Sequence, residues 1–169
     1  MPSSLYQSQY SVLSLADLAE FAHSLANELR PGDMVALDGN LGAGKTTLVQ
    51  QLGVALGIQE TVSSPTFVLM NEYRSGPYPI AHVDLYRLGP ENAEGFADEI
   101  YTLLDEGRSL ILVEWACYGE FLKEDLTLSI RLEHDPVKSN TRLITVTSKR
   151  PLNLTYPTIT PQAGMPHEE

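Results

Sequence analysis

The stretch Gly39-Asn40-Leu41-Gly42-Ala43-Gly44-Lys45-Thr46-Thr47 fits the phosphate-binding pattern G-x-x-x-x-G-K-[ST] at every fixed position. The glycines allow the backbone to curl so that its N–H groups face phosphate oxygens. Lys45 would reach the β- and γ-phosphates of a nucleotide, and the Thr46 hydroxyl would bind Mg²⁺. We therefore predict that residues 39–47 all line a nucleotide site, with Thr46 as a metal ligand.

The segments on either side of this loop decide whether the pattern has meaning, because it works only between a strand and a helix. Residues 34–37 form a short apolar run that predicts a strand entering the loop. The leucines of residues 46–56 recur on one helical face, and Gly57 follows them as a helix end. The helix N-terminus adds its dipole to the anion site. A glycine-rich turn that matches by chance is therefore disfavoured.

The composition predicts one globular domain, residues 1–150, with a net charge of −11. Strong direct binding to nucleic acid is not expected, because that requires clustered Lys and Arg. A basic protein partner or a Mg²⁺-bound phosphate compound fits this charge better.

The single cysteine, Cys117, excludes an internal disulfide and suits a reducing cytoplasm. We find no signal peptide and no apolar run near the ~20 residues of a membrane span, so we expect a cytoplasmic protein.

The first helix is predicted from a clear N-terminal signal. Ser14 is a good N-cap, and Asp17 lies where a capping box places its acidic residue. Apolar residues recur at helical spacing through residues 15–29, and the Pro-Gly-Asp sequence at 31–33 ends the helix. Residues 1–9 are polar, and we expect them to be frayed.

Two antiparallel hairpins are predicted from pairs of strand patterns separated by turn residues. The first pairs residues 67–73 with 80–84, and the second pairs 126–132 with 143–147. Residues 109–114 are almost continuously apolar, as expected of a central strand covered on both faces. Together with the loop, these patterns predict an α/β fold whose mixed sheet contains antiparallel hairpins.

Two further segments are defined by composition. Residues 90–107 predict an acidic helix that contains no Lys or Arg. Its acids are interpreted as a solvated face, or alternatively as a docking surface for a basic partner. Residues 151–169 are rich in Pro and Thr, and we predict a flexible C-terminal tail.

Two carboxylates are candidates for the second acidic group that a P-loop ATPase requires. Glu114 ends the run 109–114, and Asp84 ends the strand 80–84. Ligands of doubly wound sheets lie at the carboxyl ends of the parallel strands. We therefore predict that Glu114 binds Mg²⁺ and that Asp84 positions water or Mg²⁺-bound solvent. An ion pair with Arg87, or a helix cap, remains the alternative for Asp84.

Three more side chains are considered near these strand ends. Thr66 follows the loop helix, where GTPases keep a switch segment, so its hydroxyl is a candidate for Mg²⁺ or γ-phosphate, with ordinary turn chemistry as the alternative. Trp115 would line the nucleotide pocket, a partner site or the core. His82 lacks further ligands at suitable spacing, so we do not predict metal binding there.

Four motifs in this order resemble one known family. They are residues 39–47, Ser-Pro-Thr-Phe at 64–67, His-Val-Asp-Leu-Tyr-Arg-Leu at 82–88 and Val-Glu-Trp at 113–115. They resemble the TsaE (YjeE) family, the bacterial P-loop ATPases of tRNA threonylcarbamoyladenosine biosynthesis. The match spans roughly residues 10–148.

This resemblance implies a three-layer P-loop NTPase-like sandwich that binds ATP or ADP with Mg²⁺. It implies weak ATP hydrolysis by the chain alone and joint action with the TsaD–TsaB complex, in which TsaD performs the transfer to tRNA. By motif, it assigns phosphate and Mg²⁺ binding to Lys45 and Thr46, a switch role to Thr66, hydrolysis to Asp84 and Mg²⁺ ligation to Glu114. Lys45, Thr66, Asp84 and Glu114 are thus the predicted catalytic residues.

The resemblance also suggests which residues border the nucleotide pocket, with Trp115 beside the site, Arg142 as a nucleotide contact and Ser14 near the adenine.

Two alternative functions stay open. A small-molecule kinase would share the loop, but kinases bring lid arginines, and this chain has only 11 Lys and Arg in total. A nucleotide-gated interaction module would need ATP binding rather than hydrolysis.

Overall fold

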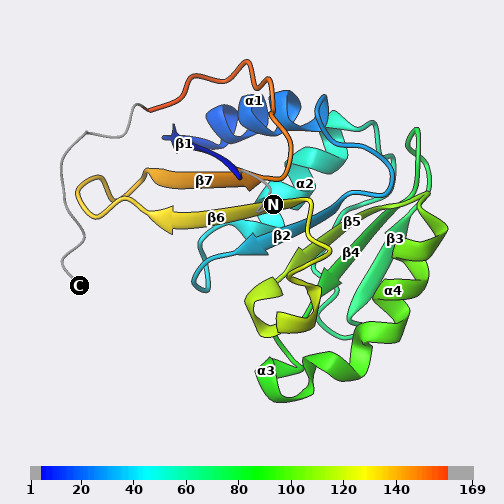
Figure 1. The fold of residues 1–169 in the computed structure, drawn as a ribbon. Helices are drawn as coiled ribbons and strands as arrows, with labels where there is room; N and C mark the ends of the chain where they lie inside the picture. Colours follow the sequence, from blue (N-terminus) through cyan, green and yellow to red (C-terminus); the bar gives the residue numbers. More distant parts are fainter. Residues whose placement is uncertain (1–4, 160–169) are drawn as a thin grey trace.

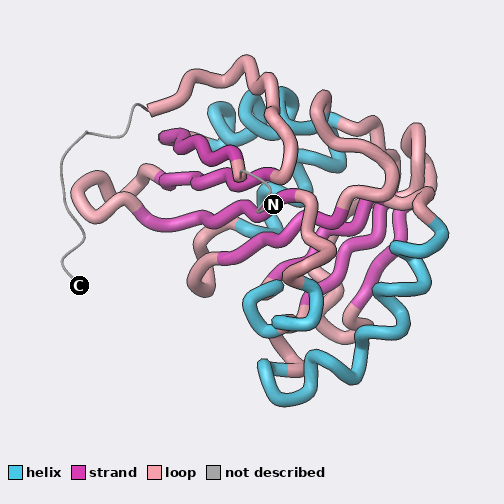
Figure 2. Tube along the Cα trace, viewed as in Figure 1, coloured by secondary structure: helices cyan, strands magenta, loops and turns pink. Residues whose placement is uncertain are grey.

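The computed structural model describes residues 5–159 as helices on both faces of a seven-stranded mixed sheet (Figures 1 and 2). This arrangement confirms the predicted α/β class. In chain order the elements are β1 (Tyr6–Val12), α1 (Leu15–Ala26), β2 (Met34–Asp38), α2 (Lys45–Ala55), β3 (Met70–Tyr73), β4 (Ile80–Asp84), α3 (Gly89–Asn92), α4 (Ala97–Glu106), β5 (Leu110–Glu114), β6 (Leu128–His134) and β7 (Arg142–Ser148). Short 3₁₀ turns occur at Ala93–Phe96, Ala116–Tyr118 and Glu120–Leu122.

The strands follow the order β1-β7-β6-β2-β5-β4-β3 across the sheet. The strand that enters the phosphate loop, β2, pairs in parallel with both β5 and β6, and β5 pairs in parallel with β4. Both predicted hairpins are confirmed, because β3 is antiparallel to β4 and β6 is antiparallel to β7. The carboxyl ends of β2, β4 and β5 therefore meet at one edge of the sheet.

Three layers result from packing on both faces of the sheet, as predicted (Figure 1). On one face, α1 and α2 bury side chains such as Phe21 and Leu48 against the sheet. On the other face, α4 contributes Ile100 to a second cluster that includes Met34. Every residue of β5 is buried, which confirms the prediction of a central strand covered on both sides.

The N-terminal prediction is wrong for part of its range. Residues 6–12 are not frayed but form β1, an edge strand antiparallel to β7 in the register Tyr6↔Ser148 to Val12↔Arg142. Tyr10 and Val12 are buried. The local sequence YQSQYSV has too few apolar residues to show this, because the strand depends on partner residues 130 or more positions away. Residues 1–4 lie outside the described range.

Two predicted boundaries also differ from the structure. The strand expected at 67–73 begins only at Met70, because residues 67–69 form a turn in which Leu69 has a φ of 66°. The helix expected over 90–107 is divided into α3, a 3₁₀ turn and α4. Gly95 and Asn92 lie in the interrupted stretch, and both residue types have low helix propensity.

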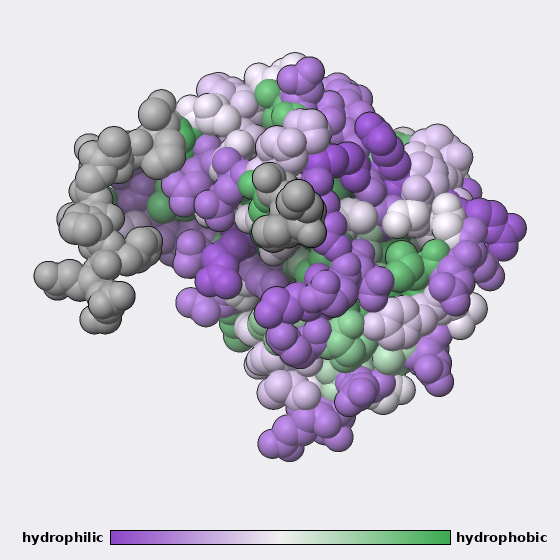
Figure 3. All heavy atoms as spheres, viewed as in Figure 1, coloured by the Kyte–Doolittle hydropathy of each residue, from purple (hydrophilic) through white to green (hydrophobic). Residues whose placement is uncertain are grey.

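The face of the molecule that Figure 3 shows is mostly polar. Figure 3 shows polar side chains over most of one face, with smaller hydrophobic patches between them. The six acids of residues 91–106 are all exposed, as expected of a solvated face. Among residues 5–159, no helix has the length and apolar character that crossing a membrane requires.

The segment after β7 is anchored along its described length, which differs from the flexible tail expected there. Leu152, Leu154 and Tyr156 pack against the core cluster beside α1. The Thr155 N–H donates to Ser24 Oγ (2.7 Å), and the Tyr156 hydroxyl donates to the Ser11 carbonyl (2.9 Å). Figure 1 shows this segment, orange to red, running past α1. Residues 160–169 lie outside the described range, and the boundary at residue 150 stays a prediction.

Replacing Tyr156 by alanine should lower the free energy of unfolding by about 2–3 kcal/mol, because it removes a partly buried ring. The ring centroid lies 5.7 Å from that of Phe21 and 6.2 Å from that of Tyr10. Urea unfolding would measure the change. Asn153→Ala, at an exposed position of the same segment, is the matched control. Equal stability of the two variants would show that the segment contributes nothing to the fold.

Candidate active site

The phosphate loop joins β2 to α2, as the motif required. Gly39 has a φ of 149°, and a Cβ at this position would lie 2.3 Å from the Leu132 carbonyl oxygen. Only glycine therefore fits there. Gly44, with a φ of 108°, is the N-cap of α2, and no described side chain caps this helix end. The first N–H groups of α2 are thus free to meet an anion.

Lys45 lies folded over the loop. Its Nζ donates hydrogen bonds to the carbonyls of Gly39 (2.6 Å) and Asn40 (3.1 Å). The same ammonium group lies 4.1 Å from the centre of the Trp115 ring. These contacts hold the positive charge at the centre of the loop.

The pKa of Lys45 reflects two opposing influences. Burial lowers the pKa, because desolvation penalises the charged form. The carboxylates of Glu114, Asp84 and Asp38 act in the opposite direction. Since these three acids end β5, β4 and β2, one edge of the sheet brings a lysine and three carboxylates together.

Glu114 and Thr46, the predicted Mg²⁺ ligands, are in direct contact. Thr46 Oγ1 donates to Glu114, with distances of 2.7 Å to Oε1 and 3.0 Å to Oε2. Hydroxyl and carboxylate oxygens are the donors that Mg²⁺ prefers, and Mg²⁺ usually adds phosphate oxygens and water. In the part of the chain that the structure describes, no group of three or more His, Cys, Asp and Glu could hold a metal ion. The Thr46 hydroxyl and the Glu114 carboxylate fit the oxygen donors that Mg²⁺ prefers.

Asp84 lies beside Glu114, in register with it across β4 and β5. Its Oδ2 accepts a hydrogen bond from Ser64 Oγ (3.2 Å), and its Oδ1 accepts one from the Tyr86 N–H (2.9 Å). The carboxylate therefore faces the site from a turn that fixes its orientation. Because β4 runs parallel to β5 and β5 runs parallel to β2, Asp84 ends its strand at the same edge of the sheet as the phosphate loop.

Thr66 lies in a short segment held against this turn. Its Oγ1 is 3.1 Å from Ser64 Oγ. Arg87 does not form the ion pair with Asp84 that was considered as an alternative, because its NH1 donates to the carbonyls of Thr66 (2.9 Å) and Phe67 (3.3 Å). Sequence reasoning missed this role of Arg87, since a contact with backbone carbonyls leaves no pattern in the sequence.

Trp115 is part of an aromatic stack at the mouth of the site. Its ring centroid lies 4.8 Å from that of Tyr86 and 5.4 Å from that of Tyr118. Its backbone has a φ of 57°, which is uncommon for a residue other than glycine. Trp115 lines the cavity at the loop and also packs, half-buried, against the core cluster that contains Met34.

Two cavities meet at the phosphate loop and share Gly42, Gly44 and Thr47. The first has a volume of about 370 Å³ and contains the catalytic candidates. It is lined by Leu41, Gly42, Gly44, Lys45, Thr46, Thr47, Ser64, Thr66, Asp84, Tyr86, Arg87, Glu114 and Trp115.

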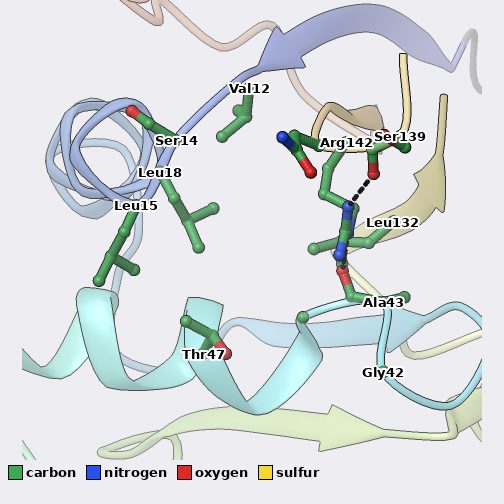
Figure 4. A pocket seen from close by; sticks show the side chains of 12 residues that line it. Val12, Ser14, Leu15, Leu18, Gly42, Ala43, Thr47, Leu132, Ser139 and Arg142 are labelled. Atoms are coloured by element: carbon green, nitrogen blue, oxygen red, sulfur yellow. Dashed lines mark hydrogen bonds between the residues drawn. The ribbon is translucent and has the colours of Figure 1, made fainter.

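The second cavity, of about 310 Å³, lies between α1 and the β6–β7 hairpin (Figure 4). Ser14, Leu15 and Leu18 line it from the side of α1. Arg142 lines the other side, where its Nε donates to the Ala43 carbonyl (3.2 Å). The structure thus brings Ser14 and Arg142 to one pocket beside the loop, although the Ser14 hydroxyl also caps α1 by accepting the Asp17 N–H (3.1 Å).

Asp38 and His82 are two residues of this sheet edge that sequence reasoning did not place in the site. Asp38 ends β2, and its Oδ1 accepts the Cys117 N–H (2.9 Å). His82 Nε2 lies 2.7 Å from Glu114 Oε1. The position of His82 two residues before Asp84 was a usable signal, because alternate strand residues share a face.

Cys117 should react slowly with iodoacetamide at pH 8. Desolvation, together with the neighbouring Asp38 carboxylate, raises the pKa of the thiol from 9.0 to about 11. The reactive thiolate is then about 100-fold scarcer than for an unperturbed cysteine. The measured rate should keep rising until the pH nears that pKa, and Asp38→Asn should move the rise to lower pH. A plateau reached near pH 9 in the unmodified chain would contradict this assignment.

Comparison with known proteins now decides the family. The family described as "Threonylcarbamoyl adenosine biosynthesis protein TsaE" matches residues 12–144. This chain belongs to the TsaE family. The matched range contains all four motifs and agrees with the span expected from them.

Individual relatives support the same assignment. A TsaE protein of Streptomyces coelicolor is 43% identical over 141 residues, which cover 77% of this chain and 89% of the relative. The crystal structure of Bacillus subtilis YdiB has a TM-score of 0.67 and 29% identity, covering 87% of this chain and 88% of that one. A TsaE protein of a Nostoc species is 47% identical over 96 residues. The chain spans about half the length of some curated TsaE relatives, with 57% of the Nostoc protein and 52% of the Bacillus subtilis protein.

Proposed function

We propose that this TsaE-family chain binds ATP and ADP together with Mg²⁺ and hydrolyses ATP weakly by itself. The observation that supports this best is the 2.7 Å contact between Thr46 Oγ1 and Glu114 at the mouth of the phosphate loop. In this proposal the loop N–H groups and Lys45 hold the phosphates. The cavity between Ser14 and Arg142 receives the adenosine, because it adjoins the loop through Gly42 and Gly44.

Magnesium, when bound, supplies positive charge that neutralises the phosphate oxygens. Thr46 and Glu114 would hold it, with Asp84 beside them through Mg²⁺-bound solvent. The chain's own residues would bind the phosphate groups directly. Lys45 would release the loop carbonyls to meet the β- and γ-phosphates, and the free N–H groups at the start of α2 would hold the same anion.

Hydrolysis needs a water molecule held in line with the bond between the γ-phosphorus and the bridging oxygen. Asp84 is the candidate that orients this water, because its carboxylate faces the cavity that also contains Lys45 and Thr46. Water attacks the phosphorus, the bond to the bridging oxygen breaks, and ADP and phosphate leave. Thr66, held by Arg87 and Ser64, would sense whether the γ-phosphate is present.

In the cell, we propose that this ATPase supports the turnover of the TsaD–TsaB complex in tRNA threonylcarbamoylation, and that it acts in the cytoplasm. Membership of the TsaE family supports the assignment of this chain to threonylcarbamoyladenosine biosynthesis. The net charge of −11 favours action through a protein complex rather than direct contact with the tRNA backbone.

Reconstitution with TsaD and TsaB tests this role. Multi-turnover modification of tRNA should require this chain and ATP, whereas a single turnover should proceed without this chain. Equal multi-turnover rates with and without the chain would refute the role. A phosphorylated product formed from ATP and a metabolite panel would instead favour the kinase. Full support by a variant that binds ATP without hydrolysing it would favour the interaction module.

A further inference from the structure

We propose that His82 is a positioning residue that orients the Glu114 carboxylate for Mg²⁺-dependent nucleotide binding. This inference rests on the proposed function of the site. The sequence does not predict metal binding by His82, because further ligands at suitable spacing are lacking. In the structure its ring contacts Glu114.

The contact itself is short and buried. His82 Nε2 lies 2.7 Å from Glu114 Oε1, with side-chain exposures of 0% and 3%. The same Oε1 atom also accepts the Thr46 hydroxyl at 2.7 Å. Glu114 is therefore held by one donor from β4 and one from α2, and these two contacts fix the plane of the carboxylate.

The sheet register explains how His82 reaches this position. In the parallel pair of β4 and β5, Asp84 is in register with Glu114 and His82 with Leu112. Alternate residues of a strand share a face, so His82 and Asp84 both lie on the side of the sheet that α2 covers. His82 lies two residues before Asp84 on the same face, and from there its ring reaches the Glu114 carboxylate.

The second ring nitrogen of His82 has no hydrogen-bond partner among the described residues, so keeping a histidine at this buried position has a cost. His82 Nδ1 is buried and has no hydrogen-bond partner among the described residues. With Nε2–H donating to the carboxylate, Nδ1 is left as an unpaired acceptor, which is costly in a buried position. An apolar side chain would avoid this cost. Within residues 5–159, the contact with Glu114 is thus the only hydrogen bond that the His82 side chain makes.

Residues that hydrogen-bond a metal ligand orient it, and their loss typically lowers metal affinity by about 10- to 100-fold. His82 stands in this relation to Glu114. His82 is not among the residues that line the two cavities at the loop. Its loss should therefore affect the contribution of Mg²⁺ and leave metal-free nucleotide binding unchanged.

The test measures affinity for a non-hydrolysable ATP analogue with Mg²⁺ and with EDTA. In His82→Leu, the gain in affinity that Mg²⁺ provides should fall by about 10-fold or more, while affinity in EDTA stays unchanged. His82→Gln should retain the gain, because a Gln amide nitrogen can reach the position of Nε2. His82→Asn should behave like His82→Leu, because its amide is too short.

A double-mutant cycle separates positioning from folding. In a Glu114→Gln background, His82→Leu should cause no further loss of the Mg²⁺ gain. If His82→Leu does not fold, His82→Asn takes its place in the cycle. A lower melting temperature with an unchanged Mg²⁺ gain would refute the role of His82 and leave the proposed function intact. Absence of nucleotide binding by the unmodified chain would refute the proposed function itself.

Discussion

Replacing Lys45 by alanine is expected to abolish measurable binding of ATP and ADP, with a loss of affinity of roughly 100-fold or more. The variant removes a charge-assisted contact to the phosphates, and such bonds are about twice as strong as neutral ones. It also removes the ammonium group that now donates to the carbonyls of Gly39 and Asn40. Isothermal titration calorimetry with each nucleotide would measure the loss.

The matched control is Lys123→Ala, which removes an exposed lysine paired with Glu120. Lys123 lines neither of the two cavities at the loop, so this variant should bind nucleotide normally. Circular dichroism should show that both variants are folded. Tight ATP binding by folded Lys45→Ala would refute the assignment of residues 39–47 as the phosphate site.

The second large effect is expected from the two carboxylates at the strand ends. Asp84→Asn and Glu114→Gln should each reduce ATP hydrolysis by about 100-fold or more while metal-free nucleotide binding is retained, and Glu114→Gln should in addition lose the gain in affinity that Mg²⁺ provides. Each change removes a negative charge that positions water or Mg²⁺ but leaves the loop backbone in place. Phosphate release under saturating ATP, with calorimetry alongside, would separate the rate of hydrolysis from binding.

Asp105→Asn is the matched control, because it neutralises an exposed acid of α4. It changes the net charge by the same amount as the test variants, so it corrects for general electrostatics. Undiminished hydrolysis in both Asp84→Asn and Glu114→Gln would refute their catalytic roles. Loss in only one of them would assign the step to that carboxylate.

The features that were predictable from the sequence are those with local signals. The phosphate loop is a continuous stretch whose glycines have backbone requirements of their own, as at Gly39, where a Cβ would lie 2.3 Å from a carbonyl oxygen. The two hairpins were marked by their turn residues. Asp84 and Glu114 could be placed because each ends an apolar run, and parallel strands bring such ends to one edge.

Other features depend on partners far away along the chain. β1 pairs with β7, and Tyr156 packs against Phe21. Neither segment has a strong pattern of its own, because its conformation is stabilised by a surface that other elements build. The prediction of frayed residues 1–9 and of a flexible segment after residue 150 treated these stretches as if they were isolated.

Residues adjacent in the chain were enough to predict the phosphate loop and an acidic residue at the end of each of two strands, whereas the pairing of those two strands came from the structure. Three features became visible only in the folded chain: His82 contacts Glu114, Arg87 holds the backbone at Thr66, and a second cavity opens beside Arg142. These contacts follow from strand register and helix packing. Both are set by burial of the whole core, which no local spacing of residues encodes.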